Sequence, residues 1–278
     1  MKPSLHPVII GGGLSFEELV DLASRHGFLG VDTGIDAIAR VIEARSLDGA
    51  REYFAERNVQ PACWGLTANW MASESEFRAG LADLPKWARI AQDIGCTRCL
   101  MWISPSTDED PQEVRRRAIA RFGECAKVLD DYGSRLGLEW VGPKTARTRK
   151  HDFIYRMDQL LDMEADMGQP NLGLLVDSFH WFTAHQTVAD LEALRAEQVV
   201  HVHLNDAPDK PRDEQIDMER LLPGEGIIDL KGFLGALKTI AYPGYMGVET
   251  FSKVLPTLPP DESAAKAKAA VDRVMALI

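Results

Sequence analysis

Short apolar runs alternate with helical patterns along the whole chain. Each run is rich in β-branched or other apolar residues and is bounded by Gly, Pro or polar turns, which is typical of a buried β-strand. The pattern predicts strands at Pro7–Gly11, Leu29–Thr33, Val59–Trp64, Arg98–Trp102, Leu136–Trp140, Leu172–Asp177, Val199–Leu204 and Met246–Thr250.

Apolar residues at helical spacing fill the segments between these runs. They predict helices over Phe16–His26, Pro85–Ile94, Val114–Tyr132 and Phe153–Met167. Asp229 precedes a further apolar face and is a candidate N-cap. A last helix is predicted over Asp261–Ile278, directly after two prolines.

Regular alternation of strands and helices predicts an α/β fold. Eight such units without a break in composition favour one (β/α)8 TIM barrel as a single domain over residues 1–278. The main alternative is a doubly wound open sheet, which usually carries a G-x-G-x-x-G turn after its first strand. The turn here, Gly11-Gly12-Gly13-Leu14-Ser15-Phe16, does not have that spacing.

Composition narrows the classes of function. A net charge of −11 and a pI near 5.1 argue against a nucleic-acid-binding protein. No apolar run approaches the roughly 18 residues that a membrane span needs, and the N-terminal run is too short for a signal peptide. Four cysteines suggest no disulfide framework, so we expect a cytoplasmic protein. Cys96 and Cys99 have a C-x-x-C spacing but lie in an apolar run, which favours buried thiols.

Four residues end consecutive predicted strands in the second half of the chain. They are Glu139, Asp177, His203 and Glu249. The carboxyl ends of barrel strands point to one mouth, so these side chains should converge there. Three buried carboxylates close together would be unfavourable without a cation, which predicts one divalent-metal site. This donor set favours Mn²⁺, Mg²⁺, Co²⁺ or Zn²⁺.

Several residues around these four are candidates for contact with a substrate. His201 is expected one layer below His203 in the same strand. His180 follows Asp177 by three residues and could bond a substrate oxygen, although a loop histidine is the simpler interpretation. Arg212 lies in the long connection between residues 205 and 229 and is a candidate clamp, with an exposed charge as the alternative.

Aromatic and basic residues near strand ends add weaker candidates. Trp64, Trp102, Trp140 and Trp181 fall at or beyond strand ends, where they could line a sugar pocket or an ordinary barrel rim. Residues 143–150 form a basic loop that could attract a phosphate or carboxylate or could simply be solvated. Lys144 is its candidate for proton transfer.

The segment from Leu136 to Phe251 resembles the xylose isomerase-like barrels of sugar isomerases and epimerases. The four metal positions match the family pattern one by one, and HVHLNDA with the later PGEGIIDL resembles its histidine strand and following turn. Within the family, LEWVG, LLVDSFHWF and PGEGIIDL are most similar to inosose isomerases. The first half of the chain matches only in its β/α rhythm.

The resemblance implies a metal-dependent isomerase or epimerase of a small keto-sugar or keto-inositol. It implies one divalent ion, typically Mn²⁺, and proton transfer through a metal-bound enediolate. Glu139 and Glu249 would then act as base and acid, and His180 and Arg212 would hold substrate oxygens. The family's ketose epimerases often carry another glutamate where Gly142–Thr145 lie here, which argues against 3-epimerisation of free ketoses.

Other functions stay open beside this one. The same enolate could expel a β-substituent, giving a lyase such as an inosose dehydratase or a 3-keto-(C-)glycoside-cleaving enzyme, with Lys144 or His180 assisting the leaving group. A DNA-repair endonuclease of the same barrel type would need more histidines at the early strand ends, where Trp64 and Trp102 lie. A metal-binding but non-catalytic barrel, acting as the partner subunit of an oxidoreductase or lyase, is the remaining alternative. The oligomeric state stays open, and a homo-oligomer is possible.

Overall fold

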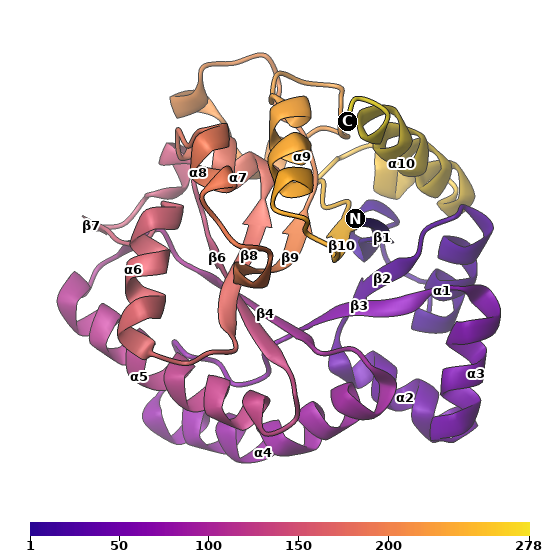
Figure 1. Ribbon diagram of the computed structural model, residues 1–278, viewed down its shortest axis with the longest axis horizontal. Helices are drawn as coiled ribbons and strands as arrows, with labels where there is room; N and C mark the ends of the chain where they lie inside the picture. Colours follow the sequence, from indigo (N-terminus) through magenta and orange to yellow (C-terminus); the bar gives the residue numbers. More distant parts are fainter.

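Eight parallel strands close into a barrel in the computed structural model, which describes residues 1–278 (Figure 1). Their order around the barrel is β1-β10-β9-β8-β6-β4-β3-β2. The strands are β1 Lys2–Leu5, β2 Gly30–Thr33, β3 Gln60–Gly65, β4 Arg98–Ile103, β6 Arg135–Trp140, β8 Leu172–Asp177, β9 Val199–His203 and β10 Tyr245–Gly247. The predicted (β/α)8 barrel is confirmed.

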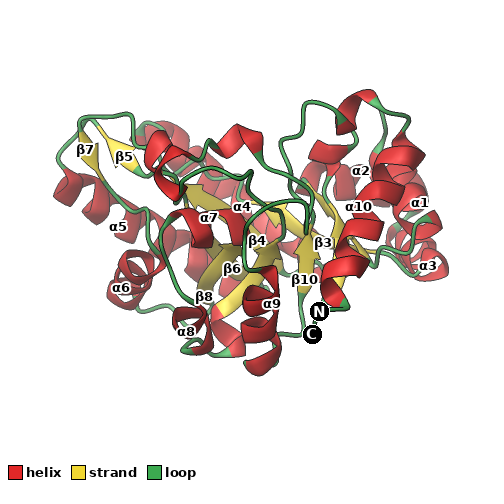
Figure 2. Cartoon of the chain, turned by 90° about the horizontal axis from the view of Figure 1, so that it is seen from above, coloured by secondary structure: helices red, strands yellow, loops and turns green.

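Helices surround the barrel on the outside (Figure 2). They are α1 Phe16–Arg25, α2 Ile35–Arg45, α3 Leu47–Arg57, α4 Glu74–Ile94, α5 Pro111–Asp130, α6 Met157–Met167, α7 Ser178–Thr183, α8 Val188–Glu192, α9 Leu230–Thr239 and α10 Pro260–Met275. None of them is long and apolar enough to span a membrane.

Local capping explains where several helices begin. Asp229 accepts a hydrogen bond from the Gly232 amide, which confirms it as the N-cap of α9. The helix predicted from Pro85 begins earlier, at Glu74, because Ser73 and Glu76 form a capping box there. Pro85 therefore lies inside α4 and does not start it.

The first strand differs from the prediction. The predicted run from Pro7 is a short 3-10 helix over Pro7–Ile9, and the strand is Lys2–Leu5. Pro7 is the first residue of the 3-10 helix, which His6 caps by accepting a hydrogen bond from the Val8 amide. Ser4, in contrast, pairs with Gly30 on one side and with Gly247 on the other. This shift places His6, whose role was not predicted, directly after β1.

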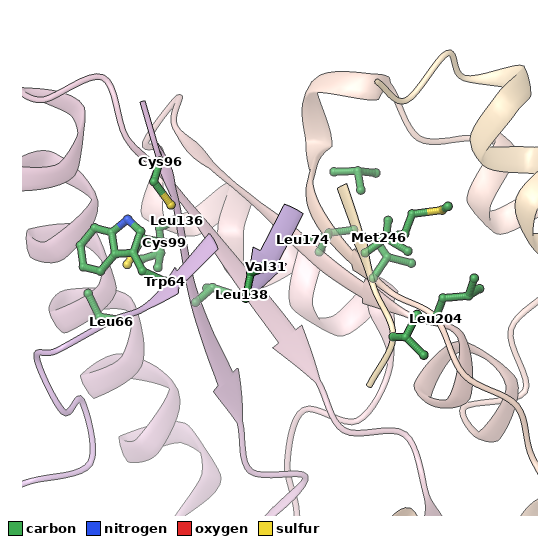
Figure 3. Close-up of a cluster of buried hydrophobic side chains, with 14 of the residues drawn as sticks. Val31, Trp64, Leu66, Cys96, Cys99, Leu136, Leu138, Leu174, Leu204 and Met246 are labelled. Carbon is green, nitrogen blue, oxygen red and sulfur yellow. The ribbon is translucent and has the colours of Figure 1, made fainter. Parts of the chain in front are cut away.

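The main hydrophobic core lies between the barrel and its helices. Figure 3 shows part of it, with Val31 on β2, Leu138 on β6, Leu174 on β8 and Met246 on β10. A separate cluster of Cys63, Leu100, Leu175 and Val200 is also buried. All four cysteines are buried and none forms a disulfide, as predicted.

A short antiparallel ladder stands apart from the barrel. β5 (Ser106–Thr107) follows β4 and pairs with β7 (His151–Asp152), which follows β6. Figure 2 shows this ladder at one edge of the molecule. It ties together the two loops that leave β4 and β6, and those loops form one wall of the barrel mouth.

Glu164 on α6 makes the stability of the barrel depend on pH. Burial raises the pKa of its carboxyl to about 8, with Arg135 opposing this, and Oε1 is buried without a hydrogen-bond partner. The folded state keeps a proton that the unfolded chain loses above its ordinary pKa of 4.5. The free energy of unfolding therefore falls as the pH rises from there toward 8.

Glu164→Gln is expected to remove this loss because an amide does not ionise. At pH 8.5 the variant should exceed the wild type in free energy of unfolding by about 4 kcal/mol more than it does at pH 5. Urea unfolding at both pH values measures the difference. Asp162→Asn, an exposed change on the same helix, is the control, and a pH profile of E164Q that is parallel to the wild type would contradict the expectation.

Candidate active site at the barrel mouth

The four predicted metal ligands come together at the carboxyl ends of their strands. Glu139, Asp177 and His203 are buried, and each offers one ligand atom within 4.8 Å of the others. His203 Nδ1 lies 3.7 Å from Glu139 Oε1 and 3.3 Å from Glu249 Oε2. Glu249 follows β10 by two residues, since that strand ends at Gly247 and not at the predicted Thr250.

The two glutamates have different electrostatic surroundings. Burial raises the pKa of Glu139 above its ordinary value, and the neighbouring imidazoles of His203 and His180 only partly offset this. Burial alone would also raise the pKa of Glu249, but His203 and Arg220 hold it well below its usual range. A pair of carboxyls whose pKa values are pushed apart is what acid and base roles require.

Arg220, which is not among the residues predicted from the sequence, is the most heavily engaged cation at the site. It is buried, and its Nη1 donates to Asp177 Oδ2 at 3.0 Å and to Glu249 Oε2 at 2.7 Å. Its Nη2 donates to Asp217 at 2.8 Å and lies 3.1 Å from His180 Nε2. The available signal was its place just before the Pro-Gly-x-Gly turn at residues 223–226.

Asp206 explains how this turn brings Arg220 to the mouth. Its carboxylate accepts hydrogen bonds from the amides of Gly224, Gly226 and Ile228, at 2.9 to 3.0 Å. Asp206 and Leu221 also exchange backbone hydrogen bonds. Asp206 therefore fixes the loop that carries the arginine.

Short helix α7 positions His180. Asp177 Oδ1 accepts hydrogen bonds from the amides of Phe179 (2.7 Å) and His180 (3.0 Å), so the last residue of β8 caps the helix. His180 consequently faces the site, and its Nε2 lies 4.0 Å from Glu139. This placement matches the expected position of a group that could bond a substrate oxygen.

Four other predicted site residues lie away from the mouth. Arg212 stacks on Phe182 at 4.4 Å, and Lys144 forms an exposed ion pair with Asp213 at 2.8 Å. Trp140 and Trp181 are buried, and their indole nitrogens donate to the carbonyls of His180 (3.3 Å) and Thr187 (3.1 Å). None of the four lines either cavity at the site, and the arginine at the ligand cluster is Arg220 instead of Arg212.

Two adjoining cavities open on the cluster. One has a volume of about 360 Å³ and lies over the ends of β1 to β4, and the other, of about 460 Å³, is walled by the loops after β4, β6 and β9. Glu139, Glu249 and Trp102 line both. Trp102 is 56% exposed and is the predicted tryptophan that lines both cavities.

The first half of the chain contributes a buried carboxylate beside His203. Asp32, at the end of β2, accepts from Ser4 Oγ and lies 3.0 Å from His201 Nε2 and 3.5 Å from His203 Nε2. Gly247 makes room for it, since a Cβ there would be 2.2 Å from Asp32 Oδ2. The two nitrogens of the His203 ring thus face opposite sides, with Nε2 toward Asp32 and Nδ1 toward Glu139 and Glu249.

A family comparison agrees with this geometry. The model of the xylose isomerase-like TIM barrel family matches residues 20–274. The chain belongs to this family. The match extends well into the first half of the chain, where the sequence analysis recognised only the β/α rhythm.

The proteins to which this chain is similar in sequence are named for different reactions. An inosose isomerase from Bacillus velezensis is 23% identical over 92% of this chain and 90% of its own length. A 3-dehydroshikimate dehydratase from Pseudomonas putida is 26% identical over 50% of this chain and 22% of its own length. Isomerisation and dehydration are therefore both represented among similar proteins.

Solved structures show the same fold. A xylose isomerase domain protein from Alicyclobacillus acidocaldarius superposes with a TM-score of 0.91 and 32% identity, covering 100% of this chain and 99% of that one. The IOLI protein with a bound zinc atom superposes with a TM-score of 0.82 and 21% identity, covering 99% and 98%.

Proposed function

We propose that this protein is a divalent-metal-dependent isomerase or epimerase of a keto-sugar or keto-inositol. The observation that carries the proposal is the pair Glu139 and Glu249, which share one histidine neighbour and both line the two cavities at the mouth. Two carboxyls with unlike surroundings can remove a proton beside a carbonyl and return it to the neighbouring carbon or to the opposite face.

The donor set fits a divalent cation. Glu139 Oε1 and His203 Nδ1 are both buried and have no hydrogen-bond partner. Together with Asp177 and Glu249 they form the oxygen-rich set with one imidazole that suits Mn²⁺, our first choice, or Mg²⁺, Co²⁺ or Zn²⁺. When bound, such a cation supplies Lewis acidity that weakens a C–H bond beside a substrate carbonyl.

The remaining residues of the site would bind and orient the substrate. Arg220 and His180 line the 460 Å³ cavity, where they can hold hydroxyl or carbonyl oxygens. The exposed face of Trp102 can pack against the C–H face of a sugar ring. Arg220 therefore takes over the role that the sequence analysis gave to Arg212.

A lyase acting through the same proton abstraction is the second candidate, because a 3-dehydroshikimate dehydratase is among the similar proteins. NMR of the metal-loaded protein with inosose and 3-keto-glucosides in D₂O separates the two. Deuterium at the α-carbon in a product that keeps all the oxygens of the substrate supports the isomerase, and loss of water or of an aglycone supports the lyase. The absence of any exchange would contradict both.

Asp32→Asn is expected to weaken metal binding by about 10- to 100-fold, because an amide no longer fixes the His203 tautomer. Isothermal titration with Mn²⁺ and with Zn²⁺ gives the dissociation constants. Ser4→Ala is the control, since it removes the contact to Asp32 Oδ1 and leaves Oδ2 facing both histidines. Equal affinities for D32N and the wild type would show that Asp32 has no orienting effect.

A further inference from the structure

The basic loop Pro143–Lys150 is held in a defined position beside the larger cavity. Thr145 Oγ1 donates to the Gln215 carbonyl at 2.6 Å. The Arg149 amide donates to Ser106 Oγ at 3.2 Å, and the Lys150 amide donates to Asp108 at 3.1 Å. The loop is therefore fixed at its start by the β9–β10 connection and at its end by the β4–α5 connection.

Only part of the positive charge in this loop is neutralised. Lys144 pairs with Asp213 at 2.8 Å, and Arg147 pairs with Asp152 at 3.1 Å. The side chains of Arg149 and Lys150 form no hydrogen bond and no ion pair. Two of the four cations are thus available to a ligand.

Arg149 and Lys150 differ in what they face. Arg149 lines the 460 Å³ cavity beside Thr148, Ser104 and Ser106, whereas Lys150 lies outside it. Glu109 is the acid near enough to Arg149 for the arginine to lower its pKa. Its carboxylate already accepts hydrogen bonds from Nη1 and Nη2 of Arg117, at 2.9 and 2.7 Å. Arg149 therefore brings an uncompensated charge to the cavity wall.

The same cavity is acidic at its other end. Glu139 and Glu249 lie there, and the charge of Arg220 is shared among Asp177, Glu249 and Asp217. The whole protein carries a net charge of −11, so its long-range field does not attract anions. A free guanidinium beside hydroxyl groups is what local binding of an anionic group requires.

We infer that the substrate of this site carries an anionic group, a carboxylate or a phosphate, which binds Arg149 while the keto end of the substrate lies at Glu139 and Glu249. The inference rests on the proposed function for the position of the keto end. It names the substrate class more closely: a hydroxylated ketone with an acid group at the far end of the ring or chain.

Arg149→Ala tests the inference, and Lys150→Ala is the matched control because it removes one charge from the adjacent residue outside the cavity. The reactive probes are neutral inosose, the carboxylate 3-dehydroshikimate, and fructose 6-phosphate against fructose. R149A is expected to raise KM for an anionic probe by about 10- to 100-fold, because the guanidinium that binds the acid group is lost. The kcat for every probe, and the KM for the neutral probes, should stay within about twofold of the wild-type values. A rise confined to 3-dehydroshikimate identifies a carboxylate, and a rise confined to fructose 6-phosphate identifies a phosphate.

Direct binding separates this inference from the proposed function. Shikimate, which has no carbonyl, and inorganic phosphate are titrated calorimetrically into the wild type, R149A and K150A. If no probe exchanges its α-proton but an anion still binds in an Arg149-dependent way, the proposed function fails and the anion site stands. If R149A and K150A have the same effect on every anionic probe, the anion site is overturned.

Discussion

Glu249→Gln is expected to lower the rate of α-proton exchange by about 10³-fold while the barrel stays folded. The amide has the shape of the carboxyl but cannot accept or deliver a proton. Glu249 is the carboxylate with the low pKa, beside His203 and Arg220, and it faces both cavities. Its loss therefore removes one of the two groups that proton transfer between neighbouring positions needs.

Exchange in D₂O measured by NMR gives kcat, and elemental analysis of the same sample gives the metal content. Glu225→Gln is the control, because Glu225 is exposed on the loop after β9 and lines neither cavity at the site. Full turnover by E249Q with metal still bound would mean that Glu249 is not an acid or base. If E249Q loses both turnover and metal, the turnover of E249Q and of the wild type is compared again at saturating Mn²⁺. Full recovery of turnover by E249Q would then mean that Glu249 only binds the metal.

Arg220→Met is expected to destabilise the metal-free protein by about 3–5 kcal/mol. The guanidinium is the shared partner of Asp177, Glu249 and Asp217. Methionine has no positive charge, so these carboxylates lose the cation that neutralises them inside the protein. The loss should lower Tm by about 10 °C. Added Mn²⁺ should recover part of it, because a divalent cation among Asp177, Glu249 and His203 again neutralises the carboxylates.

Thermal unfolding with and without Mn²⁺ measures both effects. Arg212→Met is the matched control, since Arg212 stacks on Phe182 and pairs with none of these acids. R212M should change Tm by a few degrees at most and should not respond differently to the metal. If R220M and R212M gave the same loss, Arg220 would not be the cation that neutralises the cluster.

The sequence by itself predicted the barrel and the four converging ligands. Both follow from local patterns: an apolar run of strand length marks each strand, and a polar residue at its end marks the mouth. The first strand was misplaced because Pro7 and the apolar residues after it resemble a strand more closely than Lys2–Leu5 does. That strand is defined by its pairing with β2 and β10, which no local pattern contains.

The tertiary structure alone decided which side chains from loops and distant strands reach the ligands. Arg212 and Arg220 lie in the same connection, and only the Asp206-centred turn brings the second one to Asp177 and Glu249. Asp32 meets His203 because closure of the barrel joins β1 to β10 and so brings β2 close to β9. The strand ends can be recognised from the local alternation of apolar runs and polar residues. The conformation of the loops and the closure of the barrel depend on contacts between residues far apart in the sequence, which form only when the chain folds.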